Sequence, residues 1–272
     1  MCRLLIVLPM VLFIVTGCRS LSTTTRSPAE LLAARTNYPA HWWTAVPTNG
    51  APSWEILPQA AGPGEVILSK RNELGLLSNF AATPFTFRGK RYASLEGFWQ
   101  MMKFPETSDM NTVAQAFQPA GSGDFPVARD GTGKFLEPAD KNVRATMSVD
   151  PRAKFPGLTW SYTREQVAQM IAFEAKRAGD LGSENMKRMG ITWVTFEGKQ
   201  MEYRAPEHGE FFDLIVAATW EKVRQNPDVK KVLIATGGLV LKPDHHQEPN
   251  APAAWRYYEI LTQIRRGLQR QR

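Results

Sequence analysis

The chain has 272 residues, of which 43% are hydrophobic, and it contains 14 Phe and 8 Trp. This length and composition suffice for one domain with a hydrophobic core, and they exclude a chain that is disordered throughout. The formal net charge of +7 invites a phosphorylated or nucleic-acid ligand, but a solvated basic surface is the commoner cause of such an excess.

The first seventeen residues have the pattern of a signal peptide. Arg3 precedes an apolar run, Leu4 to Val15, that is too short to span a bilayer. The sequence "VTGC" that ends at Cys18 resembles a bacterial lipobox, whose cysteine becomes the lipidated N-terminus. We expect a signal peptide over 1–17 and a lipid anchor at Cys18, the alternatives being an ordinary signal peptide or a chance apolar start. Arg19 is not the aspartate of an inner-membrane retention signal, which favours the outer membrane, facing the periplasm.

The residues from Cys18 to position 65 indicate a tether and an irregular segment. "RSLSTTTRSPAE" is polar and rich in Ser and Thr, and the stretch that follows mixes Trp with Pro and Gly. The chain has one other cysteine, Cys2, inside the predicted signal peptide. The mature chain therefore has no intramolecular disulfide, and its stability must come from packing.

The pattern from residue 64 onward predicts one α+β domain over 66–272, predominantly helical with short strands and hairpins. Residues 64–70 read as a strand, 84–93 as a hairpin that turns at Arg88-Gly89, and Ser94 as the N-cap of a helix. The segment 105–160 is rich in Gly, Pro and Asp and has no persistent period. The later elements, in chain order, are a helix over 163–182 with a Thr163–Gln166 capping box, a hairpin over 191–205, a helix over 211–225, a pair of strand-like runs over 230–243 and a helix from about 253.

The helix after Ser94 carries Glu96, Gln100 and Lys103 in one narrow row, because residues three and four apart share a helix face. Its other residues are apolar, so we expect the helix to be buried on most sides. Two interpretations of the row stay open. It lines a ligand cavity, or it forms an internal Glu96–Lys103 network or a solvent-filled slot. Glu96 lies in the first turn, where free N–H groups favour an ionised carboxylate.

Several segments in the same order resemble the NADAR family of YbiA-like domains. Its usual pattern runs Ser-Asn-Phe, a hairpin with an internal Gly, Ser-x-Glu-x-x-x-Gln and a nearby lysine. "SNF" at 78–80 and "SLEGFWQMMKF" at 94–104 match this pattern. Further matches are "AGDLG" at 178–182, Trp193 with Met201, "KVRQNPDVKKVLIATG" at 222–237, Asp244, and the closing segment from Trp255 to Arg265.

This resemblance implies a YbiA-like fold and an enzyme that hydrolyses the N-glycosidic bond of a ribosyl phosphate or an ADP-ribose derivative. Nucleic acid is then a substrate only when it is ADP-ribosylated. Glu96 is the first candidate for the carboxylate that stabilises positive charge on the ribose or activates water. Asp244 is a candidate second carboxylate, although Lys-Pro-Asp-His also suits a turn.

The other expected roles are to hold the substrate. Asn79 braces the pocket, Gln100 holds position, Lys103 and Arg71 bind phosphate, and Trp193 either stacks on a base or is a core residue. No cofactor is expected. No metal is expected either, because the adjacent His245 and His246 point opposite ways in an extended segment and no third ligand has suitable spacing. The rival hypotheses are an envelope-anchored nucleotide-binding module without catalysis, and an interaction protein that uses its Trp-rich N-terminal segment.

Overall fold

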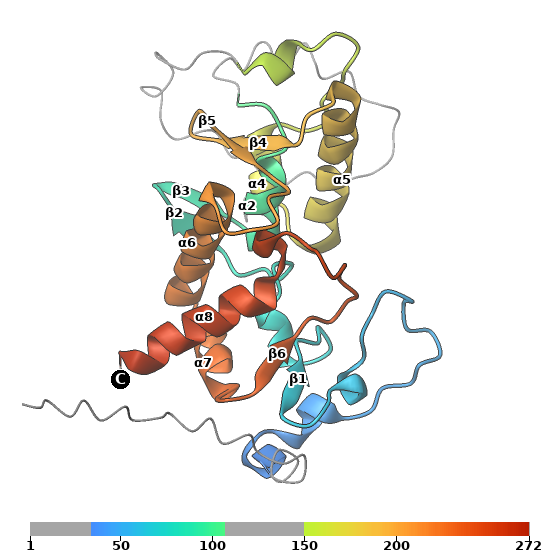
Figure 1. The fold of residues 1–272 in the computed structure, drawn as a ribbon, viewed down its shortest axis with the longest axis vertical. Helices are drawn as coiled ribbons and strands as arrows, with labels where there is room; N and C mark the ends of the chain where they lie inside the picture. The colour runs from blue at the N-terminus through green and yellow to red at the C-terminus, as the bar shows by residue number, and fades with distance from the viewer. Residues whose placement is uncertain (1–33, 107–149, 272) are drawn as a thin grey trace, which may run out of the picture.

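The structure is a computed structural model that describes residues 34–106 and 150–271 (Figure 1). The predicted signal peptide, Cys18 and most of the 105–160 segment lie outside the described residues. The α-helices are α2 (Leu95–Met101), α4 (Arg164–Ala168), α5 (Ala172–Met189), α6 (Glu210–Gln225), α7 (Pro227–Ala235) and α8 (Tyr257–Arg270). The strands are β1 (Glu65–Ile67), β2 (Phe85–Phe87), β3 (Lys90–Tyr92), β4 (Trp193–Phe196), β5 (Lys199–Glu202) and β6 (Val240–Lys242). Short 3₁₀ helices occupy Ala34–Asn37, Ala40–Trp43, Pro58–Ala60, Glu73–Leu77, Pro151–Lys154 and Ala253–Trp255.

The predicted mixture of dominant helices and short strands is confirmed. In the described residues the strands form three separate pairs: parallel β1–β6, and the antiparallel hairpins β2–β3 and β4–β5. The β1–β6 pair joins strands that are far apart in the sequence. It lies beside α7 and α8, whereas β4–β5 lies at the opposite end of the molecule beside α2, α4 and α5 (Figure 1). α2 packs against β3, α4, α5 and α6.

Both predicted hairpins form because their turns contain a glycine in the left-handed region. Arg88 and Gly89 have φ of 48° and 75°, and Glu197 and Gly198 have φ of 53° and 75°. Two consecutive positive φ angles make the tight turn whose twist matches antiparallel strands. The hairpin predictions therefore hold at both turns.

The single helix expected over 163–182 is wrong, since it is divided into α4 and α5. The capping box of Thr163 and Gln166 begins α4 as predicted. α4 then ends, and the carbonyl of Met170 accepts a hydrogen bond of 2.8 Å from Ser94 Oγ. Ala172 has φ of 48°, which turns the chain into α5. A contact with another helix therefore overrides the helical period of the sequence.

The prediction that the first of the two runs over 230–243 forms a strand is also wrong, because this run lies in α7. Pro227 occupies the first turn, where its missing N–H costs nothing, and it fixes the φ of a helix start. Val229 and Leu233, four residues apart, are buried on one face. The second run forms β6, and Gly237 with φ of 52° separates the two.

The core extends from the irregular N-terminal segment to the last helix. Trp42 is buried, and its indole N–H donates to Glu73 Oε1 at 2.7 Å. The apolar face predicted for the last helix is confirmed, with Tyr257, Ile260, Leu261, Ile264 and Leu268 all buried. Within 34–106 and 150–271, no helix is both long and apolar enough to cross a membrane.

Candidate functional site

Glycines let neighbouring helices approach α2 closely. A Cβ on Gly97 would lie 2.6 Å from the carbonyl oxygen of Met170, at the end of the α4 segment. A Cβ on Gly179 of α5 would lie 1.8 Å from Gln100 Oε1, and one on Gly182 would lie 2.9 Å from Lys103 Cβ. These glycines explain the "AGDLG" stretch physically, since any larger side chain would collide with the polar row.

All seven residues of α2 are buried, as expected from its apolar composition. Ser94 caps the helix by accepting a hydrogen bond of 2.9 Å from the N–H of Gly97. The row itself is also buried, with Glu96 6%, Gln100 8% and Lys103 4% exposed. Three polar side chains in so apolar a setting need partners or a ligand.

Glu96 and Gln100 interact directly, and Lys103 has its partners elsewhere. Gln100 Nε2 donates to Glu96 Oε1 at 2.7 Å. Lys103 Nζ instead donates to Ser183 Oγ at 2.8 Å and to the Gly179 carbonyl at 3.3 Å, both on α5. The predicted row is therefore real, but it contains no direct Glu96–Lys103 ion pair.

Two atoms of the row have no hydrogen-bond partner among the described residues. Glu96 Oε2 accepts no hydrogen bond from the described residues. Gln100 Oε1 is sealed and also has no partner. A carboxyl that is held through one oxygen can keep its orientation and engage a substrate with the other.

Burial raises the pKa of Glu96, and the Gln100 hydrogen bond and the Lys103 charge oppose this only in part. The expectation that the helix N-terminus would favour an ionised carboxylate is thus wrong in direction, because α2 is short and its first turn is fully desolvated. A carboxylate with a raised pKa is a stronger base, which suits a group that accepts a proton.

Burial lowers the pKa of Lys103 to about 8, although the nearby charges of Glu96 and Asp180 oppose the shift. Its ammonium lies 5.0 Å from the centroid of the Tyr203 ring. Arg204 is exposed, lies 5.2 Å from the Trp255 ring, and has no carboxylate partner in the described ranges. The positive charge of Arg204 also helps to lower the pKa of Lys103.

Sequence reasoning did not single out Tyr203 or Arg204. The available signal was the strand period, which places Met201 and Tyr203 on one buried face and Arg204 on the other. Tyr203 packs between Trp255 and Phe211, with ring centroids 5.4 Å and 5.5 Å away. It forms an aromatic wall beside Lys103.

Asp244 is buried and fully engaged. His245 Nδ1 lies 3.0 Å from Oδ1, Tyr257 donates to Oδ1 at 3.2 Å, and the Lys70 ammonium binds Oδ2. Burial alone would raise the pKa of Asp244, but the His245 hydrogen bond and the Lys70 charge lower it. With both oxygens occupied, Asp244 is placed to position Lys70 rather than to accept a proton.

The remaining predicted residues lie at different distances from the row. The Asn79 carbonyl accepts a hydrogen bond of 2.9 Å from the Glu96 N–H, which matches a bracing role through the backbone. Arg71 is exposed and forms hydrogen bonds of 2.7 Å and 2.6 Å with Glu55. Trp193 is half-buried, and the Arg152 guanidinium lies 5.0 Å from its ring. No described contact joins Arg71 or Trp193 to Glu96.

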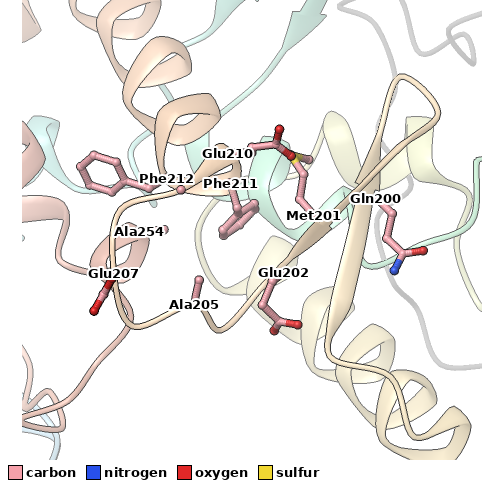
Figure 2. Close-up of a pocket in the computed structure, with 10 residues that line it drawn as sticks. Gln200, Met201, Glu202, Ala205, Glu207, Glu210, Phe211, Phe212 and Ala254 are labelled. Atoms are coloured by element: carbon pink, nitrogen blue, oxygen red, sulfur yellow. The ribbon is translucent and has the colours of Figure 1, made fainter.

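A hollow of about 230 Å³ lies between β5, the loop after it and the start of α6 (Figure 2). Its lining residues are Gln200, Met201, Glu202, Ala205, Glu207, Gly209, Glu210, Phe211, Phe212 and Ala254. Glu96 is absent from this set, and the only ionisable side chains there are glutamates. We place the candidate site at the polar row because its buried charged groups require a partner, whereas the hollow presents mainly apolar surface and acidic residues.

The chain was also compared with protein-family models, curated proteins and solved structures, and none of them matches it. Within the described residues no group of three His, Cys, Asp or Glu side chains is placed to hold a metal ion. The site must therefore be interpreted from its own residues.

Gly179→Ala is expected to destabilise the chain by about 1–3 kcal/mol, because the new methyl group overlaps Gln100 and forces its side chain away from Glu96. Equilibrium urea unfolding measures the change. The control is Gly209→Ala, where no atom lies within 4 Å of the new Cβ. Equal effects of the two substitutions would contradict the close α2–α5 contact.

Lys222 lies on α6 and carries a buried ammonium group. Its Nζ donates to the Ser78 carbonyl at 2.6 Å, next to Asn79, and the described residues give it no carboxylate partner. Burial lowers its pKa from 10.5 to about 7. Lys222 thereby connects α6 to the loop that braces Glu96. Its burial lowers the free energy of unfolding by an amount that depends on pH, because the charged ammonium is desolvated.

Lys222→Met is expected to show this cost as a pH-dependent stability difference. Between pH 7 and 10.5 the unfolded chain binds more protons at Lys222 than the folded chain, so the contribution of Lys222 to stability rises with pH. The stability of the wild type relative to the variant should therefore improve by about 1 kcal/mol per pH unit from pH 7 to 9. Unfolding curves at each pH measure this, and a constant difference would contradict a desolvated lysine.

Proposed function

We propose that the chain is an N-glycosidase that hydrolyses the N-glycosidic bond of a ribosyl phosphate or an ADP-ribose-like substrate, with Glu96 as the catalytic carboxyl. The single observation that carries this proposal is the state of Glu96. It is buried, it is held by Gln100 through one oxygen, its other oxygen has no partner among the described residues, and burial raises its pKa. The resemblance of "SNF" and "SLEGFWQMMKF" to NADAR domains supplies the reaction class.

In the proposed reaction, water attacks C1′ of the ribose as the C1′–N bond breaks, and Glu96 takes one proton from the water. A departing amine or neutral base gains a proton from solvent or from the carboxylic acid so formed, whereas the pyridinium nitrogen of NAD leaves as a neutral base and the proton on Glu96 passes to solvent. The products are the free amine or base and ribose with a hydroxyl group at C1′. While it is ionised, Glu96 also stabilises the positive charge that develops on the sugar ring.

The charged residues near Glu96 support a substrate that carries phosphate. Lys103 belongs to the row, the charge of Arg204 acts on the pKa of Lys103, and Arg204 has no competing carboxylate among the described residues. A guanidinium and an ammonium together suit phosphate oxygens. Arg204 thus joins Lys103 in the phosphate-binding role, whereas Arg71 is already paired with Glu55.

A panel of substrates tests the proposal: ribosylamino-pyrimidine phosphates, NAD and ADP-ribosylated nucleic acid. Incubation in ¹⁸O-labelled water with the full chain is expected to release a free base or amine and to place the label on the C1′ hydroxyl. Thermal stabilisation by these compounds without turnover would overturn the enzyme proposal in favour of a binding module. If these compounds neither stabilise the chain nor are hydrolysed, both the enzyme proposal and the binding-module alternative are overturned.

A further inference from the structure

Three aromatic rings from distant parts of the chain gather beside the candidate site. The Phe173 ring centroid lies 5.2 Å from that of Phe80 and 6.2 Å from that of Trp54, both in edge-to-face geometry. Trp54 is 41% and Phe173 46% exposed, which is high for side chains of this size. The Lys70 ammonium lies 5.7 Å from the Trp54 ring and 5.2 Å from the Phe80 ring. We call Trp54, Phe80 and Phe173 the aromatic platform.

The two residues that follow Trp54 hold its segment in place. Glu55 forms a β-bridge with His245 and a bidentate ion pair with Arg71. The Ile56 N–H donates to the Asp244 carbonyl at 2.8 Å. The ion pair between Arg71 and Glu55 therefore fixes the segment that carries Trp54, so this exposed tryptophan keeps a defined position.

Phe173 is held by a strained backbone. Ala172 adopts φ of 48°, which is uncommon for a residue with a Cβ, and its N–H donates to the Phe80 carbonyl at 3.1 Å. This bond ties the start of α5 to the Phe80 segment. Strain of this kind persists where surrounding structure enforces it, and it is concentrated at ligand-binding positions.

The aromatic platform is continuous with the polar row. Phe80 directly follows Asn79, whose carbonyl accepts the Glu96 N–H. Lys70, which contacts two rings of the platform, also binds Asp244 and is near enough to Glu96 to lower the pKa of that carboxyl. A ligand whose sugar lies at Glu96 would thus have aromatic surface within reach.

We infer that Trp54, Phe80 and Phe173 form the stacking site for the base of a nucleotide whose ribose lies at Glu96, so that the segment before residue 65 completes the ligand site. The inference rests on the proposed function for the placement of the ribose. Aromatic faces bind any nucleobase by stacking, and Lys70 adds positive charge beside them. The ligand class is therefore a purine or pyrimidine nucleotide rather than a bare sugar phosphate.

Binding of two probes to the full chain tests this inference: adenosine 5′-monophosphate, which has a base, and ribose 5-phosphate, which has none. The wild type should bind the nucleotide more tightly. Trp54→Ala and Phe173→Ala should each weaken nucleotide binding about tenfold and change ribose 5-phosphate binding less than about twofold. The matched control is Phe155→Ala, which removes a ring of similar exposure, 42%, outside the platform; both affinities should stay unchanged.

Equal binding of the two probes by the wild type, or equal loss of both in the platform variants, would overturn the stacking site. Its failure can be told apart from failure of the proposed function. If the nucleotide binds as expected but no N-ribosyl bond is hydrolysed, the stacking site stands and the enzyme proposal falls. If hydrolysis occurs with the same kcat/KM in wild type, Trp54→Ala and Phe173→Ala, the stacking site is overturned and the enzyme proposal stands.

Discussion

Arg152→Met is expected to lower the free energy of unfolding by about 3–5 kcal/mol, because it leaves a buried carboxylate without its partner. Arg152 is 2% exposed and binds Asp150 through hydrogen bonds of 2.7 Å and 3.1 Å. Its guanidinium also donates to the Met102 and Phe104 carbonyls, both at 3.2 Å. The residue therefore satisfies the C-terminal end of the helix that carries the candidate site.

Urea unfolding measures this effect, and the double variant Arg152→Met/Asp150→Asn is its matched control. The second substitution removes the stranded charge, so the double variant should be more stable than Arg152→Met alone. Asp150 accepts a further hydrogen bond of 3.0 Å from the Glu106 N–H, which asparagine can keep. A double variant that is less stable than the single one would contradict the ion-pair explanation.

Local chemistry made the hairpins and the helix cap predictable. Gly89 and Gly198 identify tight turns because the required backbone angles are left-handed, and Ser94 identifies a helix start because its hydroxyl binds a free N–H. Each signal acts over a few residues. The burial of α2 was predictable for a similar reason, since its apolar residues leave only a narrow polar row.

Contacts between distant segments were not predictable from the sequence. The division between α4 and α5 depends on the hydrogen bond from Ser94 to the Met170 carbonyl. The pairing of β1 with β6 brings together two segments that are far apart in the sequence. α7 was misread as a strand because a short apolar run suits either structure. The roles of Gly179 and Gly182 required the packing against α2 to be seen.

The candidate site was predictable in its residues but not in its energetics. Glu96, Gln100 and Lys103 do share one face, yet burial outweighs the helix N-terminus in setting the pKa of Glu96. The partners of Lys103 on α5 and the approach of Arg204 come from tertiary structure. The lipid anchor at Cys18 lies outside the described residues and stays a prediction.

Glu96→Gln is expected to lower kcat/KM by about 10²–10⁴-fold on any substrate that the chain hydrolyses, the usual contribution of a general acid–base group. Glutamine keeps the size of the side chain and an oxygen that can accept the Gln100 hydrogen bond, but it can neither take a proton nor stabilise a cation as a charge. The substitution also removes the cost of a desolvated carboxylate, so the fold should be retained. Substrate binding should change little, because Lys103 and Arg204, not Glu96, are the proposed phosphate contacts.

The pH profile gives a further expectation for this residue. Activity of the wild type should rise with pH as Glu96 loses its proton, at a pH above the usual range for glutamate, and fall above about pH 8 as Lys103 loses its charge. The matched control is Glu248→Gln, which alters an exposed carboxylate away from the row. Its kcat/KM and its pH profile should equal those of the wild type.

The most direct test of the account is the rate of N-glycosidic bond cleavage by the wild type, Glu96→Gln and Glu248→Gln, measured side by side as release of the free base with each protein confirmed to be folded. The account predicts cleavage by the wild type and Glu248→Gln, and a loss of at least about a hundredfold in Glu96→Gln with substrate affinity retained. Cleavage by Glu96→Gln at the wild-type rate would contradict it.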